Sequence, residues 1–199
     1  MKLKILLISL LSFFAYSAQA QSYHLGLRMG YSSSVLNSQN DGGPRIADRG
    51  GFLIGLVHTY KSDFSDFGFS IETGYLRKGA QVGEIDLDYR MQFLTMPVLL
   101  DFYPTQKIRL SVGPSANFLL DARNHTVTTD SSYTVKDQYT NRWELSGVVS
   151  ASYSLDYFAD IGIRYTRGIN TLSNRDAILR RRDISTSTLQ FFLYLKIAN

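Results

Sequence analysis

The sequence predicts an all-β fold, an eight-stranded antiparallel up-and-down transmembrane β-barrel, and three observations support the prediction. The N-terminus has the pattern of an export signal, the rest of the chain alternates apolar and polar residues, and the connections between predicted strands alternate between long and short. A period of two residues indicates a β-strand with one apolar face. Short turns at one end and long loops at the other are typical of bacterial outer-membrane barrels.

Residues 1–20 predict a cleaved signal peptide. Lys2 and Lys4 make the start positive, an almost unbroken apolar run covers 5–15, and small residues follow at Ala18 and Ala20. The apolar run is shorter than the roughly 20 residues that a membrane-spanning helix needs. We therefore expect a secretory signal in 1–20 and a single barrel domain over 21–199.

The composition excludes several classes of function. The chain contains no cysteine, which excludes a disulfide framework and a thiolate metal site. Without Lys2 and Lys4 the formal charge of +4 falls to +2, too small a value to indicate nucleic-acid binding. The sequence shows no Gly-rich phosphate loop and no carboxylates at metal-ligand spacing, so neither a cofactor nor a metal is expected.

The alternation is plainest at the first predicted strand, where Tyr23, Leu27 and Met29 share one face and Arg28 and Ser32 share the other. One other strand alternates less cleanly, and its inward and outward faces cannot be assigned from the sequence; it covers 51–60. The predicted strands are 23–32, 51–60, 67–77, 89–102, 107–120, 142–153, 158–167 and 185–197.

The connections suggest how such a barrel would sit in a membrane. The short ones cover 61–66, 103–106 and 154–157, and the long, polar ones cover 33–50, 78–88, 121–141 and 168–184. We expect the short turns to face the periplasm and the four long loops to face outside.

Aromatic residues gather at both ends of the predicted strands, as the interfacial girdles of a membrane barrel would require. Those at the short turns are Tyr60, Phe64, Phe67, Phe102, Tyr103, Tyr153, Tyr157 and Phe158. Those near the long loops are Tyr31, Tyr75, Tyr89, Tyr139, Trp143 and Tyr165.

Seven charged residues fall on the polar faces of the predicted strands: Arg28, Glu72, Asp101, Arg109, Glu144, Asp160 and Arg164. An eight-stranded barrel is just wide enough for side chains to fill it, so these groups should pair with one another. A structural plug of ion pairs is favoured over an ion or proton pathway. If Tyr103 pairs with Lys107 across the turn, Asp101 lies directly opposite Arg109.

The sequence offers residues for two further kinds of site, a catalytic site and a phosphate-binding site. A lipid-modifying enzyme would need a nucleophile and a histidine base, but His24, His58 and His125 follow no interpretable spacing, so no catalytic residue is expected. The basic segment of the last loop offers guanidinium groups that suit phosphate. It predicts either contact with lipopolysaccharide or a merely solvated loop, and its arginines are Arg175, Arg180, Arg181 and Arg182.

Two segments carry a family resemblance. Residues 94–103 read LTMPVLLDFY and residues 110–115 read LSVGPS. This pattern resembles the PorT-like outer-membrane β-barrel proteins of the Bacteroidetes, and 26–32, 71–75 and 162–168 are similar to that family's first, third and seventh strands. The end of the chain departs from the family, because such barrels usually finish on an aromatic residue and this one finishes on Asn199.

The pattern of strands and loops predicts a cell outer-membrane location and a monomeric barrel with a non-enzymatic, structural or interaction role. Outer-membrane lipid, including lipopolysaccharide, would be its surroundings. The resemblance implies an alternative role, as a component of a secretion or transport assembly with an envelope protein as partner. A lipid-modifying enzyme is a remoter alternative.

Overall fold

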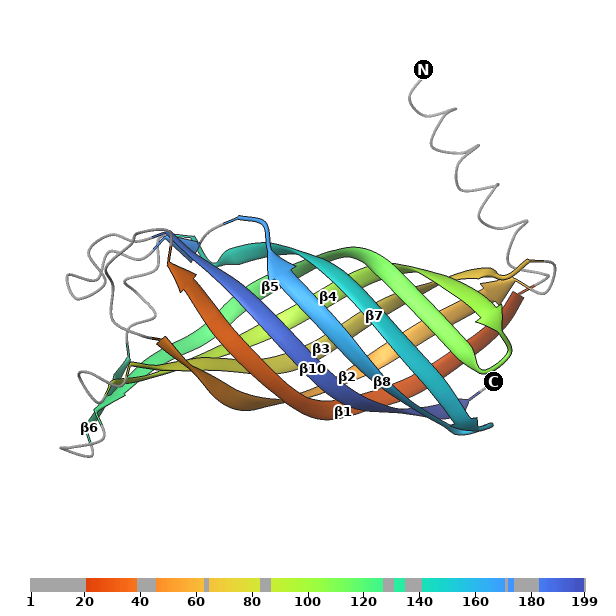
Figure 1. The fold of residues 1–199 in the computed structure, drawn as a ribbon, viewed down its shortest axis with the longest axis horizontal. Helices are drawn as coiled ribbons and strands as arrows, with labels where there is room; N and C mark the ends of the chain where they lie inside the picture. The colour runs from red at the N-terminus through yellow and green to blue at the C-terminus, as the bar shows by residue number, and fades with distance from the viewer. Residues whose placement is uncertain are drawn as a thin grey trace, which may run out of the picture.

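Eight long antiparallel strands close into one barrel in the computed structural model (Figure 1). The strands are β1 (Gln21–Ser38), β2 (Ile46–Ser62), β3 (Phe67–Val82), β4 (Leu87–Thr105), β5 (Ile108–Thr126), β7 (Trp143–Asp156), β8 (Ala159–Gly168) and β10 (Asp183–Ala198). Two short strands, β6 (Ser131–Thr134) and β9 (Leu172–Ser173), extend the sheet beside β5 and β10. The structure describes residues 21–38, 46–62, 65–82, 87–126, 131–134, 141–170, 172–173 and 183–198. The predicted barrel is confirmed, whereas the expected signal peptide lies outside the described residues.

Pairing between β1 and β10 closes the barrel and leaves no free edge among its long strands. Gly30 of β1 lies opposite Phe192 of β10 at this seam. A Cβ atom at Gly30 would stand 2.1 Å from the carbonyl oxygen of Phe191 and 2.8 Å from the Cα of Phe192. Glycine is therefore required here by the close approach of two backbones. None of the described residues forms a helix long and apolar enough to cross a membrane.

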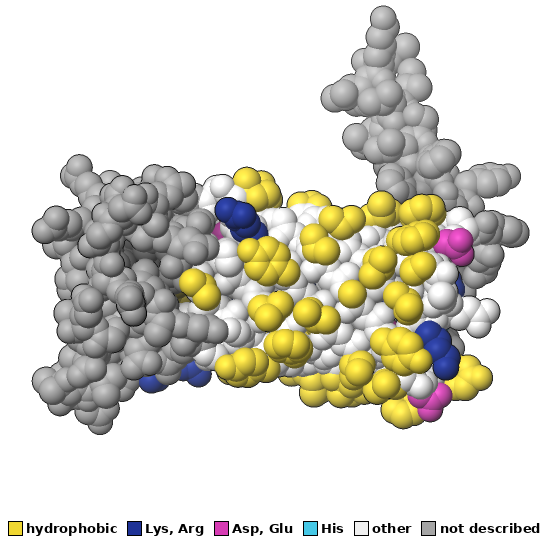
Figure 2. Space-filling view, in the orientation of Figure 1, with side chains coloured by type: hydrophobic (Ala, Val, Ile, Leu, Met, Phe, Trp, Pro, Cys, Tyr) yellow, Lys and Arg dark blue, Asp and Glu magenta, His cyan; other side chains and the backbone are white. Residues whose placement is uncertain are grey.

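Large apolar side chains point outward along the middle of the barrel. Val149 is 59% exposed and Leu100 is 55% exposed, and Figure 2 shows apolar side chains spread over the middle of the visible face. The alternate residues of the same strands are buried inside. An apolar exterior around a polar interior suits hydrocarbon rather than water.

The structure assigns the faces of the second strand, which the sequence left open. Leu53 and Val57 point inward with 6% and 2% exposure, whereas Ile54 and Leu56 point outward. The inward pair belongs to an apolar cluster inside the barrel, formed by Leu53, Val57, Leu76, Phe192 and Tyr194. Because both faces of β2 are apolar, its alternation is blurred.

The strands extend further toward the loop end than predicted. The expected long connection 78–88 is wrong, because β3 continues to Val82 and β4 begins at Leu87. Pairing of β3 with β4 runs on through Lys78 opposite Met91 and Gln81 opposite Asp88. Backbone pairing does not need an apolar face, so strands can continue where the alternation that identifies them has faded.

The predicted register of the β4–β5 hairpin is also wrong. Thr105 pairs with Ile108, so Gln106 and Lys107 form the turn, and Asp101 lies opposite Ser111 rather than Arg109. The Thr105 hydroxyl accepts hydrogen bonds from the backbone amides of Lys107 (3.3 Å) and Ile108 (3.1 Å), a local bond that favours a tight turn. The slip is two residues, so Asp101 stays on the inner face.

Aromatic girdles occur at both ends of the barrel. At the turn end, Tyr60 stacks on Phe69 with ring centroids 4.6 Å apart. At the loop end, the rings of Phe118 and Trp143 lie 5.0 Å apart. Tyr103 differs from the prediction, because it lines a cavity inside the barrel mouth. Phe64, Tyr139 and the side chain of Tyr89 lie outside the described part of the chain.

Candidate functional site: the charged interior of the barrel

The middle of the barrel is filled by a triad of one carboxylate, Glu72, and two guanidinium groups, Arg28 and Arg164. Arg164 of β8 donates two hydrogen bonds to the Glu72 carboxylate of β3, at 2.8 and 2.9 Å. Arg28 of β1 forms an ion pair with the same carboxylate. The ring of Phe192 lies 5.5 Å from the Arg28 guanidinium carbon and 5.7 Å from that of Arg164. A carboxylate and an aromatic face together stabilise two buried cations that would otherwise repel.

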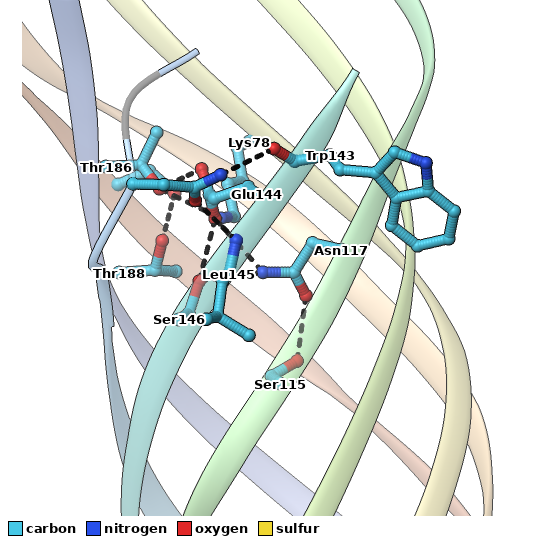
Figure 3. A network of polar contacts seen from close by, with 11 residues as sticks. Lys78, Ser115, Asn117, Trp143, Glu144, Leu145, Ser146, Thr186 and Thr188 are labelled. Atoms are coloured by element: carbon cyan, nitrogen blue, oxygen red, sulfur yellow. Dashed lines mark hydrogen bonds and ion pairs between the residues drawn. The ribbon is translucent and has the colours of Figure 1, made fainter. Parts of the chain in front are cut away.

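A second network lies nearer the loop end (Figure 3). Lys78 of β3 contacts Glu144 of β7 at 2.7 Å, with side chains 0% and 1% exposed. Glu144 also accepts hydrogen bonds from Asn117, Ser146 and Thr186, at 3.0, 3.0 and 2.7 Å. Trp143, the preceding residue, points the other way, out of the barrel. The period of two thus places one neighbour in the membrane interface and the other in the interior.

A third network lies near the short turns. Asp160 of β8 accepts a hydrogen bond from the Ser154 hydroxyl at 2.8 Å. It also forms ion pairs with Lys196 at 2.8 Å and with Arg109 at 3.8 Å. Arg109 of β5 also donates to the Ser152 hydroxyl at 3.2 Å. Its guanidinium carbon lies 5.1 Å from the ring centroid of Tyr194.

Asp101 stands apart from these ion pairs. It accepts a hydrogen bond from the Ser70 hydroxyl through one carboxylate oxygen. The other oxygen is buried and has no hydrogen-bond partner among the described residues. Asp101 and Arg109 still interact electrostatically. The register slip thus replaces the expected direct ion pair by a longer-range attraction.

The structure places all seven sequence-predicted charges on the inner face; six of them belong to the three networks, and Asp101 stands apart. Sequence reasoning missed Lys78 and Lys196. Lys78 was assigned to a loop, although it lies one residue beyond the end of the predicted strand 67–77 and on the same face as Glu72 and Leu76. Lys196 shares the inward parity of Phe192 and Tyr194, a signal that could have identified it.

The middle of the barrel leaves little free space. A cavity beside Arg28 and Arg164 measures about 20 Å³, room for about one water molecule. A larger cavity of about 130 Å³ lies among the turn-end residues and includes Arg109, Asp160 and Lys196 in its lining. The interior is therefore filled by side chains in the middle of the barrel and hollow at the turn end.

An arginine cluster lies on the outer surface at the loop end, formed by Arg77 of β3, Arg90 of β4 and Arg123 of β5. Arg90 lies directly opposite Arg123, and Arg77 follows the girdle residue Tyr75 by two positions. Arg123 contacts Asp121 at 2.7 Å, and its side chain is largely exposed. The sequence analysis did not identify this cluster. The arginines that it named for phosphate contact, Arg175 and 180–182, lie outside the described residues.

Two of the histidines lie on opposite sides of the barrel wall. His24 lines the turn-end cavity, whereas His58 is hydrogen-bonded to the outward-facing Tyr23 hydroxyl at 2.8 Å. The side chain of His125 lies outside the described set. Among the described residues, no group of three histidines, cysteines or carboxylates could hold a metal ion.

Two solved structures share this architecture. Neisserial surface protein A has 13% identity and a TM-score of 0.56, with 89% of this chain and 99% of that chain covered. Ail, the attachment invasion locus protein of Yersinia pestis, solved with the heparin analogue sucrose octasulfate, has 13% identity and a TM-score of 0.51, covering 88% and 99%. At such identities the likeness shows the fold.

Sequence comparisons complete the assignment. A search of curated proteins gives no significant match. Residues 18–174 match the model of a family described as the outer membrane protein beta-barrel domain. This match spans most of the chain and agrees with the closed barrel and its apolar exterior. The chain therefore belongs to the outer membrane protein beta-barrel domain family and is an eight-stranded β-barrel of the outer membrane.

Proposed function

We propose that this protein is a non-enzymatic interaction protein, a plugged barrel that displays four loops and holds phosphorylated lipid of the outer leaflet. The observation that carries the proposal is the filled interior, in which Glu72 binds Arg28 and Arg164 across the barrel. A lumen occupied by side chains offers no wide path for solutes. Binding is then left to the loops, the outer surface and the mouths.

The purified protein should give little or no steady current in planar lipid bilayers. The Glu72 and Glu144 networks cross the lumen at two levels, and the ion pairs hold their side chains in place. A large, reproducible ohmic conductance would contradict the plugged barrel. As a control, Glu72→Ala, which removes the central carboxylate, should admit more current than the unaltered protein if the ion pairs are the barrier.

The arginine cluster supports contact with lipid phosphate. Arg77 lies two residues past Tyr75, which is about 7 Å further along the strand. Lipid headgroups begin at this level, just beyond an aromatic girdle. Two arginines directly opposite each other repel, and Arg90 and Arg123 are such a pair. Asp121 already pairs with Arg123, and a lipid phosphate would bring a further anion to the two arginines, because guanidinium binds phosphate in a bidentate manner.

Lipid binding provides the direct test. The double variant Arg90→Gln, Arg123→Gln should bind lipopolysaccharide in detergent at least about tenfold more weakly, since charge-assisted hydrogen bonds to phosphate are lost. Dephosphorylated lipopolysaccharide should bind the unaltered protein as weakly as the variant binds the native lipid. Lys61→Gln with Lys107→Gln, which removes the same charge at the opposite end, is the matched control. Equal binding by both double variants would contradict the proposal.

The alternative role is that of a PorT-like component of a secretion or transport assembly. It is supported by the motif segments, since 94–103 falls on β4 and 110–115 on the adjacent β5. Crosslinking in cells from a photoreactive residue at the strongly exposed Tyr157, between β7 and β8, tests it. Repeated capture of one envelope protein would support the assembly role, and the lack of any repeatedly captured protein would contradict it.

A further inference from the structure

The hollow mouth at the turn end has the features of a binding site. Its cavity of about 130 Å³ is bordered by side chains from many strands, among them Lys61, Tyr103, Arg109, Tyr194 and Lys196. Lys107 reaches it from the β4–β5 turn. The cavity is thus enclosed by the barrel wall on its sides and by the packed interior below.

The lining is strongly cationic. Lys61, Lys107, Arg109 and Lys196 border the cavity, and Asp160 is the carboxylate in the same lining. Asp160 is already engaged by Lys196 and Ser154, so the formal charge of the lining leaves a clear positive excess. A cavity with charges of one sign and walls of low dielectric constant concentrates the field and attracts counter-ions.

A buried hydroxyl points to a missing partner. Tyr194 is 1% exposed, it lines this cavity, and its hydroxyl has no hydrogen-bond partner among the described residues. The Thr59 hydroxyl lies near enough to interact with it and also accepts a hydrogen bond from Arg109 at 3.4 Å; a contact in which Thr59 donates its own proton leaves the Tyr194 proton without an acceptor. A buried hydroxyl left without a partner costs free energy, and an acceptor bound in the cavity would satisfy it.

We propose that this mouth binds a compact oxyanion, a phosphate or carboxylate group, presented by a molecule in the periplasm. Arg109 and Lys196 supply charge at the floor, and Tyr194 donates its hydroxyl proton to the ligand. Lys61 and Lys107 attract and hold the anion at the rim, where Lys61 also lies 4.8 Å from the ring of Tyr103. This site is separate from the outer arginine cluster, which lies at the opposite end of the barrel.

Nuclear magnetic resonance of the protein refolded in detergent micelles tests the site. Sodium phosphate replaces sodium chloride stepwise while the ionic strength is kept constant. Phosphate should shift the backbone amides of Tyr103, Arg109 and Lys196 in a saturable manner and leave unchanged the amide of Leu145, which lies near the loop end of β7 and belongs to neither proposed anion site. A parallel titration with sodium acetate shows which oxyanion the site prefers. Tighter binding of phosphate would identify a phosphate group as the ligand, and tighter binding of acetate would identify a carboxylate. Equal shifts with chloride, or no saturation with either oxyanion, would overturn the proposal.

Two sets of variants separate binding from folding. Lys61→Gln with Lys107→Gln should weaken oxyanion binding about tenfold or more, as expected for two lost charge-assisted contacts. Arg142→Gln with Arg167→Gln removes the same charge at the loop end, outside the arginine cluster, and should leave the affinity unchanged. Unaltered affinity in the first pair would overturn the site.

Tyr194→Phe removes the hydroxyl and keeps the ring. It should weaken oxyanion binding severalfold without lowering resistance to denaturant, because an unpartnered hydroxyl contributes nothing to folding. If the variant instead lost stability and kept its oxyanion affinity, the hydroxyl would serve the fold, and its assignment as a ligand donor would be overturned.

Discussion

Replacing Glu72 by alanine should lower the free energy of unfolding by about 3–5 kcal/mol, the cost of breaking a buried ion pair by removing one partner. The variant leaves Arg28 and Arg164 buried beside each other, and among the described residues the Phe192 ring is the contact that remains to stabilise both cations. Both guanidiniums already carry an Nε atom without a hydrogen-bond partner among the described residues. No spare polar contact is therefore at hand to compensate for the loss.

Denaturant unfolding in lipid vesicles would measure the loss. The fluorescence of Trp143, the single tryptophan, reports the transition from the membrane interface. Replacing the whole triad by apolar residues of similar size (Arg28→Met, Glu72→Leu, Arg164→Met) should cost far less than Glu72→Ala, because well-packed apolar residues often replace buried ion pairs without loss. The inner cluster of Leu53, Val57 and Leu76 provides apolar surroundings. If Glu72→Ala were as stable as the triple variant, the ion pairs of the triad would not be what holds the strands together across the barrel.

The parts of the fold that could be predicted are those in which one chemical rule governs a whole strand. In β1, hydrocarbon outside and a polar lumen inside produce strict alternation, and Tyr23, Arg28 and Met29 lie on the faces that their parity predicts. The rule fails in β2, because Leu53 and Val57 join an inner apolar cluster. It also fails at the loop end, where β3 carries Arg77 on its outer face and the buried Lys78 on its inner face, so no apolar face marks where the strand ends.

The site was predictable as a list of inward charges but not as a set of pairs. The odd or even position of a residue in its own strand decides which face it lies on. This local rule places Glu72, Glu144 and Asp160 inside the barrel, whatever the neighbouring strands are. Pairing depends on the stagger of strands around the barrel, and Glu72 meets Arg164 from a strand far along the chain. The β4–β5 hairpin shows how sensitive this is, since the hydrogen bonds of Thr105 in the turn move Asp101 away from Arg109.

The arginine cluster escaped prediction for the same reason. Arg77, Arg90 and Arg123 lie far apart in sequence, and Arg123 lies beyond the end of its predicted strand, 107–120. Only the register brings Arg90 opposite Arg123 on one outward face. A search for runs of adjacent arginines, such as the one at 180–182, cannot detect a cluster that the sheet assembles.

The Lys78–Glu144 pair should respond unequally to the loss of its two members. Lys78→Met leaves Glu144 with hydrogen bonds from Asn117, Ser146 and Thr186. Glu144→Gln leaves the Lys78 ammonium with the Thr186 hydroxyl at 3.0 Å and the ring of Phe93 at 4.8 Å. Because the stranded cation keeps fewer contacts than the stranded anion, Glu144→Gln should cost about 3–5 kcal/mol and Lys78→Met clearly less.

A double-mutant cycle makes this measurable. With both residues replaced, no buried charge remains unpaired, so the loss should be smaller than the sum of the single losses, and the coupling energy should fall within about 0.5–3 kcal/mol, the range for residues in one network. Unfolding midpoints and slopes of the four proteins in the same vesicles give that energy. A coupling near zero would mean that Glu144 is held by its hydroxyl and amide donors alone. A larger loss from Lys78→Met than from Glu144→Gln would show that the lysine, and not the carboxylate, organises the loop-end network.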